Sequence, residues 1–305
     1  MTFMEYVQAV VDGLLFGAVY ALIGIGFTLI FGVMNKINMA YAAASFAGAY
    51  VSLGVAQVVG LTGEFGLPPF VMFLVSAAVG GVFAYILYLI CFRWTPDHYE
   101  LSSLMATIGS LLLIDEIVVH LTNGEPQNYP EVLQGIFEDP MLEFGEDFAI
   151  RGDLLTLFVV AVIATCILLW LLFRTKLGLA TRAVAQQRMA AQLCGIKVDT
   201  TNATTFVIAG VLGGLAGAMI GAIVGTLLQS LVVIPLTIKG LIVTVIGGLG
   251  SIPGAIVGGL LVGAFENVFL AIRGVTERDM YVMLLLFLFL AFRPQGFFGR
   301  VAVRD

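Results

Sequence analysis

Long apolar runs separated by short polar stretches extend along this chain from end to end. A helical run of about 20 apolar residues is long enough to cross a bilayer core of about 30 Å. The sequence therefore predicts an all-α bundle of about nine transmembrane helices. The count stays between eight and ten, because the seventh run contains Lys239 and the eighth follows after only a Gly-Ser turn. The nine segments are 7–33, 37–60, 67–92, 101–121, 153–173, 202–226, 231–249, 252–272 and 279–292.

The small number of charged residues supports a fold that faces lipid. Only 11% of the 305 residues are charged and 60% are hydrophobic, whereas soluble domains carry about 25% charged residues. A water-soluble protein of this size would have too few charges to cover its surface. No linker, low-complexity stretch or second domain interrupts the pattern. We therefore expect a single transmembrane domain over residues 1–305.

Charge is distributed unevenly and predicts the orientation of the chain. The stretch from Thr122 to Asp153 holds eight acids and one base, whereas the segment 174–200 holds five bases and one acid. Short loops rich in Lys and Arg stay in the cytoplasm. We therefore expect 174–200 to be cytoplasmic, 122–152 to be an acidic external loop, the N-terminus to be external and the C-terminus cytoplasmic. The acidic balance argues against nucleic-acid binding.

Glycine recurs every four residues in two parts of the chain. Small residues at this period let helix backbones touch, which favours association in lipid. We interpret the pattern as a packing signal, with a ligand role as the less favoured alternative. Similar Gly-rich helices in both halves hint at an internal repeat of the kind that transporters use. The glycines assigned to helix packing are Gly213, Gly217, Gly221, Gly225, Gly250, Gly254 and Gly258.

Motifs for catalysis and metal binding do not occur in the sequence. There is no Walker A loop, GxSxG elbow, HExxH motif or pair of catalytic carboxylates. His98 and His120 stand alone, and the three cysteines lack CxxC spacing. We therefore expect a protein that is not an enzyme, with no metal site and no cofactor of its own.

Four ionisable side chains fall at membrane depth, where charge is costly and usually faces protein or water. Asp115 and Glu116 lie two-thirds along the fourth segment and are interpreted as lying near the outer interface. Lys239 and Glu266 could pair and hold helices together, and a direct role in transport is the alternative. An ion-coupled carrier would use such residues, so they also motivate a rival function.

The segment 174–200 is the most informative polar stretch. From Leu179 to Leu193 it is rich in alanine and favours a single helix, which Gly195 would cap. Such a helix, with apolar and basic sides, suits docking in the groove of a partner protein. A helix that rests on the membrane surface explains the segment equally well.

Four stretches, in order and with their spacing preserved, are similar to motifs of one known family. They are GLLFGAVYALIGIGFTLIFGV at Gly13–Val33, the basic segment Arg174–Asp199, GGLGSIPGAIVGG at Gly247–Gly259 followed by Glu266, and RPQGFFG at Arg293–Gly299. The chain resembles the branched-chain amino acid permease family of ABC transporters, the LivH/LivM type. Two places differ from the family pattern. Residues 38–42 (NMAYA) replace N-F-A-H-G followed by an acid, which puts the substrate in doubt, and Gln187 replaces the usual Asp.

The resemblance implies a permease domain in the plasma (inner) membrane of a bacterium or archaeon. It implies pairing with a second permease subunit, homologous and of the LivM type, and with two cytoplasmic ATPases that bind ATP and Mg²⁺. A periplasmic binding protein would deliver the substrate. It also implies that 181–195 inserts into an ATPase, and the residues assigned to this coupling are Thr181, Arg182, Gln187, Arg188, Leu193 and Gly195.

The leading interpretation is an importer permease for branched-chain or other apolar amino acids. Within the same class, urea, short amides and aromatic carboxylates remain alternative cargoes. An ion-coupled carrier that works alone is an alternative of another class, and a membrane assembly subunit without a transport path is a third. The polar residues assigned to the substrate pathway, for each of which core packing or helix capping is the competing interpretation, are Tyr20, Asn35, Asn38, Tyr41 and Ser45.

Overall fold

The computed structural model of the chain describes residues 3–58, 69–95, 100–129, 142–143, 149–227, 229–274, 277–293 and 295–299. Within these ranges, one helix corresponds to each of the nine predicted apolar segments. A π-helical turn, η1 (Tyr88–Phe92), continues the third helix. The nine helices are α1 (Phe3–Met34), α2 (Tyr41–Val58), α3 (Pro69–Leu87), α4 (Glu100–Thr122), α5 (Gly152–Arg174), α8 (Val198–Val224), α9 (Gln229–Gly247), α10 (Ile252–Arg273) and α11 (Arg278–Phe292).

Six helices in the described part of the chain are long and apolar enough to cross a bilayer: α1, α3 with η1, α4, α5, α8 and α10. Helices α2 and α9 are apolar but shorter, and α11 holds 15 residues. At 1.5 Å per residue, α11 extends about 22 Å, which is less than the bilayer core of about 30 Å. The prediction of a polytopic helical membrane protein is confirmed.

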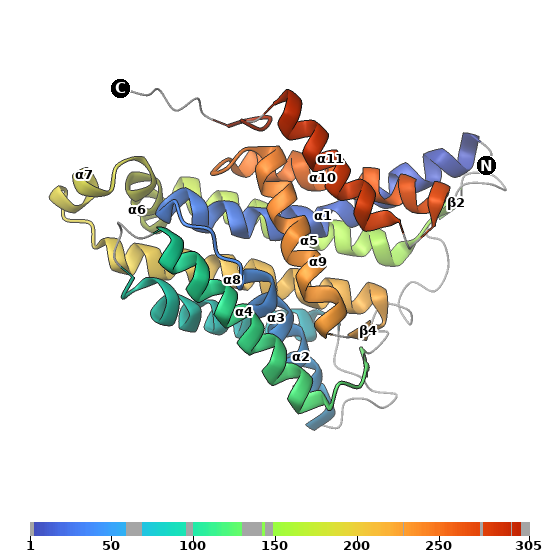
Figure 1. Cartoon of the computed structure of the whole chain (residues 1–305), viewed down its shortest axis with the longest axis horizontal. Coiled ribbons are helices and arrows are strands. Elements are labelled where there is room, and N and C mark those ends of the chain that lie inside the picture. Colours follow the sequence, from blue (N-terminus) through green and yellow to red (C-terminus); the bar gives the residue numbers. More distant parts are fainter. Residues whose placement is uncertain are drawn as a thin grey trace.

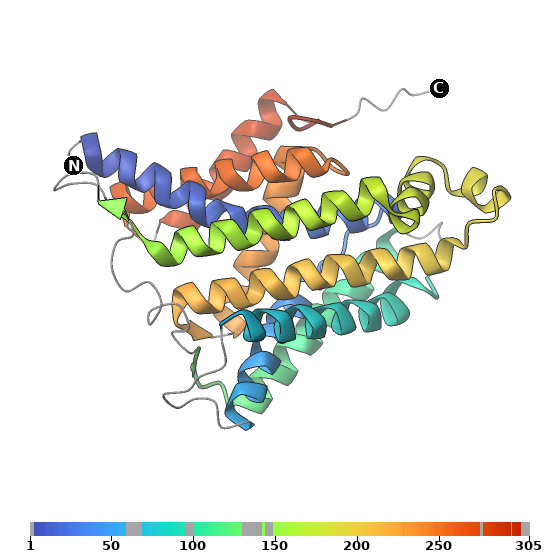
Figure 2. The same ribbon diagram turned by 180° about the vertical axis from the view of Figure 1, so that it is seen from behind.

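Helices α1, α5 and α8 run roughly alongside one another, and α9 crosses them steeply (Figures 1 and 2). Helix α1 packs most extensively against α10, and α8 packs most extensively against α3, with α2 contacting both α3 and α8. Fully buried side chains such as Ile23, Phe46 and Phe206 fill the centre of the bundle. Helices α4 and α5 present rows of exposed apolar side chains, which suits surfaces that face lipid.

Close backbone contacts account for most of the glycine periodicity. A Cβ atom on Gly217 would lie 2.6 Å from the backbone oxygen of Ser45 in α2. A Cβ atom on Gly258 would lie 2.7 Å from the backbone oxygen of Val243 in α9. Real Cβ atoms do not approach other atoms so closely, so a side chain at either position would push two helices apart. Gly213, Gly221 and Gly254 also lie against neighbouring segments.

Gly225 and Gly250 differ from the other glycines assigned to helix packing, although Gly250 still lies at van der Waals distance from Gly32 in α1. Both have positive φ angles, of 71° and 83°, and both lie outside helices. No atom comes within 3.4 Å of a Cβ built at either position. Gly225 ends α8 and Gly250 lies in the turn between α9 and α10, so each is needed for its left-handed conformation. The four-residue spacing simply continues past the helix ends.

Two short antiparallel ladders, which were not predicted, occur near the acidic loop. Strand β1 (Gln127–Asn128) pairs with β4 (Thr226–Leu227), and β2 (Leu142–Glu143) pairs with β3 (Ala149–Ile150). Next to β1, the Tyr129 hydroxyl lies 3.2 Å from Ser52 Oγ, and burial raises the pKa of Tyr129. The greater part of the predicted loop, 130–141 and 144–148, lies outside the described residues, as does His98.

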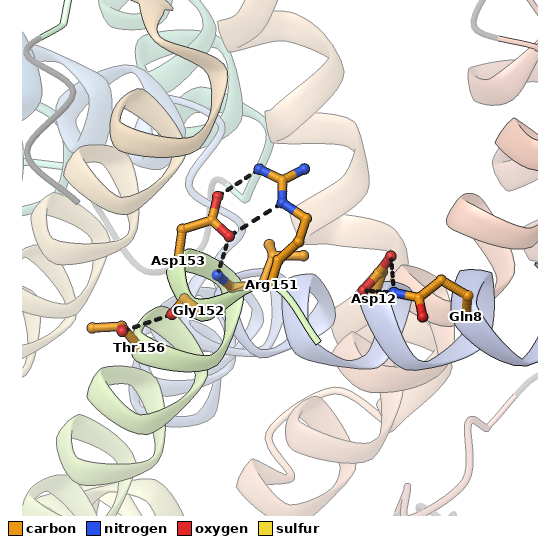
Figure 3. Close-up of polar contacts among 7 residues, drawn as sticks. Gln8, Asp12, Arg151, Gly152, Asp153 and Thr156 are labelled. Carbon is orange, nitrogen blue, oxygen red and sulfur yellow. Dashed lines mark hydrogen bonds and ion pairs between the residues drawn. The ribbon is translucent and has the colours of Figure 1, made fainter. Parts of the chain in front are cut away.

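Polar contacts order the start of α1 and the start of α5, and Figure 3 shows those made within each helix. Gln8 Nε2 donates to the carbonyl oxygen of Ala149 at 2.7 Å, and Gln8 Oε1 accepts from the Ala149 amide at 3.3 Å. Gln8 also donates to Asp12 on the next turn. Arg151 Nη2 lies 2.5 Å from Asp153 Oδ2, and this exposed pair stands at the first turn of α5. The Gln8–Ala149 contacts hold the start of α1 against the last residues of the acidic loop.

Candidate functional site

A helical projection formed by α6 (Lys176–Gln186) and α7 (Arg188–Leu193) extends beyond the ends of α5 and α8 (Figures 1 and 2). The single helix predicted over 179–193 was wrong, because Gln187 is extended (φ −156°, ψ 106°) and separates α6 from α7. Gln187 occupies the N-cap of α7, where its side chain makes no capping hydrogen bond. Asp, the residue expected from the resemblance, is a strong N-cap. A helix that begins after position 187 therefore agrees with the Asp that the resemblance leads one to expect there, although the alanine-rich composition favours a continuous helix.

The projection has one buried side and one exposed side. Val184 and Ala191 are buried and pack with Val33 at the end of α1 and Val198 at the start of α8. On the opposite side, Met189 and Leu193 lie one helical turn apart on α7 and are 69% and 90% exposed. We call Met189 and Leu193 the apolar tip. Two large apolar side chains held in this way present a small contact surface at the end of the molecule.

The predicted coupling residues divide between these two sides. Thr181 is buried and its hydroxyl donates to the Leu177 carbonyl at 2.9 Å, so its side chain lies on the buried side of the projection. The Arg182 guanidinium lies 5.0 Å from the centre of the Phe173 ring on α5. Gly195 has a φ of 83° and shapes the turn after α7. Arg188, the first residue of α7, lines a polar cavity.

Tyr41 and Ser45, two of the predicted pathway residues, lie in the contact between α2 and α8. The Tyr41 hydroxyl donates to the carbonyl oxygen of Ala209 at 2.8 Å, and Ser45 Oγ donates to the carbonyl oxygen of Tyr41 at 2.8 Å. Both side chains are buried against Gly213. Neither residue lines the polar cavity that Arg188 helps to form. In this conformation both residues serve helix packing.

The other three pathway candidates are dispersed. Asn35 is exposed, with a φ of 52°, where α1 ends. Asn38 is buried, and its Oδ1 accepts from the Ala40 amide at 3.1 Å just before α2 begins. Tyr20 lies in the middle of α1, with its ring centre 5.8 Å from Lys239 Nζ. The five candidates therefore do not converge on one site.

Lys239 and Glu266 form a buried ion pair that joins α9 to α10, with Nζ 2.9 Å from Oε1. Two residues in the first turn of α11 extend this pair. Lys239 Nζ also lies 2.8 Å from Asp279 Oδ1, and Arg278 Nε lies 2.8 Å from Glu266 Oε1. We call these four residues the charge cluster. Its two cations balance its two anions, as expected for charges removed from water. The cluster connects three helices.

Asp115 and Glu116 lie on α4, about 10 Å from the helix end at Thr122. Glu116 is exposed, and Asp115 Oδ1 is buried with no hydrogen-bond partner among the described residues. Helix α4 contacts α2 and α9, whereas Glu266 lies on α10. Asp115 and Glu116 therefore lie on a helix that makes little contact with α10, which carries Glu266.

Comparison with known proteins gives the family of this helical bundle. A family model described as the permease component of a branched-chain amino acid transport system matches residues 9–292. The chain belongs to this permease family. It is 30% identical to the high-affinity branched-chain amino acid transport system permease protein BraD of Pseudomonas aeruginosa, over 98% of this chain and 97% of that protein.

Two further relatives in this permease family extend the match. The chain is 27% identical to the high-affinity branched-chain amino acid transport system permease protein LivH of Escherichia coli K12, over 99% of this chain and 98% of that protein. It is 28% identical to a probable branched-chain amino acid transport permease protein LivH of Methanocaldococcus jannaschii, over 83% of this chain and 78% of that protein. The resemblance based on four motifs is thus confirmed nearly end to end.

Sequence reasoning missed Arg278 and Asp279, which complete the charge cluster in this member of the permease family. Both stand at the start of the last apolar run, where charges are ordinary because helix ends meet the membrane interface. The usable signal was Lys239, because a cation at membrane depth needs a buried or nearby partner. The pairing of Lys239 with Glu266 was suggested, but no feature of the sequence indicated that Lys239 has a second partner.

Proposed function

We propose that this chain is the transmembrane permease subunit of an ATP-driven ABC importer that moves branched-chain or other apolar amino acids into the cytoplasm. The N-terminus is external, and the C-terminus and the α6–α7 projection are cytoplasmic. The chain works with a second, homologous permease subunit, two cytoplasmic ATPases that use ATP and Mg²⁺, and a periplasmic binding protein. The substrate class rests on the family description and on the names of its relatives.

The observation that carries the proposal is the shape and chemistry of the projection. Its apolar tip, Met189 and Leu193, is exposed and belongs to α7. Helix α7 lies beyond the ends of the long helices (Figure 1). A helix that only rested on the membrane would keep such side chains beside the bundle, within reach of lipid. An apolar tip held away from the bundle instead suits insertion into the groove of a partner protein. The excess of Lys and Arg in the segment 174–200 supports a cytoplasmic location for this end, where ATP is available.

The proposed cargo also agrees with the interior of the chain. The buried charges at membrane depth on α9 and α10 are engaged in the charge cluster. Few charges remain to select a strongly charged solute within this subunit, so selection falls mainly to the binding protein. Urea, a short amide or an aromatic carboxylate would fit the same architecture, and the affinity of the binding protein for each solute distinguishes these cargoes.

The test is co-isolation of the complete importer with a Leu193→Glu variant. A charge at the centre of an apolar contact should cost at least about 2 kcal/mol, which weakens ATPase association roughly 30-fold. Val224→Glu, at the opposite end of α8, adds the same charge to an exposed apolar position and serves as the matched control. Normal ATPase recovery with Leu193→Glu would contradict docking through the tip. Uptake by this chain without ATPases would favour a carrier that works alone.

A further inference from the structure

A polar cavity of about 230 Å³ opens at the end of the bundle that carries the projection. Its walls come from four separate elements: the end of α1, η1 with the residues that follow it, the start of α7, and the first turns of α8. None of the residues assigned to the transport path lies in these walls. The lining residues are Met34, Tyr88, Phe92, Arg93, Trp94, Thr95, Arg188, Asp199 and Asn202.

The cavity combines two cationic groups with one anionic group and one buried amide. Arg93 and Arg188 supply guanidinium groups, and Asp199 supplies a carboxylate. Asn202 is only 2% exposed, and its Oδ1 has no hydrogen-bond partner in the described part of the chain. A buried acceptor without a donor is unfavourable, so this oxygen is ready to accept a hydrogen bond from a bound molecule.

We propose that this cavity binds the α-ammonium and α-carboxylate groups of a free amino acid from the cytoplasmic side. The planar guanidinium of Arg93 suits a carboxylate, which it can hold through two parallel hydrogen bonds. Asp199 and the Asn202 Oδ1 acceptor suit an ammonium group, which has only donors to offer. With a volume of about 230 Å³, the cavity has room for a small solute. The cytoplasmic assignment rests on the proposed function.

Because the cavity lies beside the projection, a molecule bound in it would affect transport. Arg188 is the first residue of α7, and the Tyr88 hydroxyl already joins η1 to α8 by donating to the Asp199 carbonyl at 3.2 Å. A ligand held by Arg93, Arg188 and Asp199 would connect η1, α7 and α8 at once. It would therefore stabilise one placement of the projection, and binding of imported product would slow further import. The π-helical form of η1 is itself a feature often found at functional sites.

The lining also predicts what the cavity does not recognise. Seven of its nine residues carry polar side-chain groups, and the two wholly apolar members, Met34 and Phe92, come from different elements. A hydrophobic pocket distinguishes one methylene by roughly 10–200-fold. This cavity should instead bind the common main-chain end, so L-alanine and L-leucine should differ by less than about tenfold.

A direct binding test uses Trp94, which lines the cavity beside Arg93. The chain has two tryptophans, and the second, Trp170, lies exposed on α5. The full chain with Trp170→Phe, in lipid nanodiscs, should show a saturable change in Trp94 emission with L-leucine. The deaminated analogue 4-methyl-2-oxopentanoate and the decarboxylated analogue isoamylamine should each bind at least tenfold more weakly, because each lacks one charged group.

Variants separate recognition from a general effect on the fold. Arg93→Gln and Asp199→Asn should each weaken L-leucine binding at least tenfold, and Arg93→Lys should retain part of it. Arg273→Gln, at the far end of α10, removes an exposed arginine outside the cavity and should leave the titration unchanged. No saturable emission change with L-leucine would overturn the proposal. Equal binding of inorganic phosphate would also overturn it, in favour of a general anion site.

The functional test uses proteoliposomes that hold the complete importer and ATP inside, with binding protein and labelled solute outside. Unlabelled L-leucine in the lumen should slow initial uptake by the natural protein. Arg93→Gln should keep the uptake rate measured without luminal leucine and lose at least tenfold in sensitivity to it. Equal sensitivity of both proteins would refute the proposal. Failure of all ATP-driven uptake would instead refute the proposed function, while the Trp94 titration would still report on the cavity.

Discussion

The charge cluster gives the sharpest stability prediction, because it places four ionisable side chains among α9, α10 and α11. Lys239→Met removes the cation that contacts both carboxylates and keeps much of the side-chain volume. Glu266 then keeps one partner, Arg278 Nε at 2.8 Å, while Asp279 loses its 2.8 Å contact. The cluster changes from neutral to a net charge of −1. The variant should therefore destabilise the helix bundle without creating a large cavity.

The magnitude follows from how much of each charge remains exposed to water. Removing one partner of a buried pair costs about 3–5 kcal/mol. Glu266 is buried but keeps Arg278, and Asp279 is about half exposed and can be hydrated. We therefore expect Lys239→Met to cost about 3 kcal/mol, at the lower end of that range. Glu266→Gln should cost about 2 kcal/mol, because Lys239 keeps Asp279 as a partner.

A double-mutant cycle measures the coupling between these two residues. The double variant removes both members of the buried pair and should cost about 3 kcal/mol, which is less than the sum of the single changes by about 2 kcal/mol. The assay is unfolding of the full chain in mixed micelles, followed by the loss of helix signal as denaturing detergent is added. Arg151→Gln, which breaks the exposed Arg151–Asp153 pair, is the control and should cost less than about 1 kcal/mol.

If the stability cost of the double variant equals the sum of the two single costs within about 0.5 kcal/mol, this reasoning is refuted. They would mean that Lys239 and Glu266 do not sense each other's charge, as when each is solvated separately. A variant with normal stability but altered uptake would likewise move these residues from helix packing to transport. The cycle thus discriminates between the two roles that the sequence left open for Lys239 and Glu266.

Three further predictions use packed and exposed positions. Gly217→Val should destabilise the bundle by about 1–3 kcal/mol, because its Cβ would meet the Ser45 backbone oxygen. Gly109→Ala, whose Cβ would have no atom within 4 Å, is the control and should be neutral or stabilising in the same unfolding assay. Equal losses of stability in the two variants would contradict the packing role of Gly217. Tyr41→Phe should cost about 1 kcal/mol by removing its bond to Ala209 and leave solute preference in uptake unchanged, and a changed preference would restore Tyr41 to the pathway. In a Cys166→Ser variant, exposed Cys194 should react with a membrane-impermeant maleimide only in inside-out vesicles, since Cys91 is buried; labelling in right-side-out cells would reverse the orientation.

The helices themselves could be predicted from the sequence because the bilayer imposes a simple length rule on apolar runs. The ends of the predicted segments 252–272 and 279–292 agree with α10 and α11 to within one residue. The break at Gln187 could not be predicted in the same way. Alanine-rich composition measures local helix preference, whereas the break depends on how Val184 and Ala191 pack against Val33 and Val198. That contact joins parts of the chain far apart in sequence.

The candidate pathway residues show a second limit of sequence reasoning. A polar side chain in a membrane helix can face a solute, or it can satisfy a backbone group of its own or a neighbouring helix. Tyr41 and Ser45 take the second role, since both donate to backbone carbonyls. Periodicity cannot separate these roles, because both place the residue on a buried, small-residue face. The difference depends on whether an acceptor lies opposite, as Ala209 does for Tyr41.

The same argument explains why the most informative polar cavity was not found among the predicted transport residues. Arg93, Asp199 and Asn202 lie near helix ends, where polar residues are ordinary and raise no signal in a hydropathy pattern. What distinguishes them is that separate elements bring unlike charges and a buried, unpaired acceptor to one cavity. In a membrane protein with few charges, polar groups at midmembrane form the hydrogen bonds and ion pairs that hold helices together. Groups at the helix ends, which water can reach, keep the capacity to bind a solute.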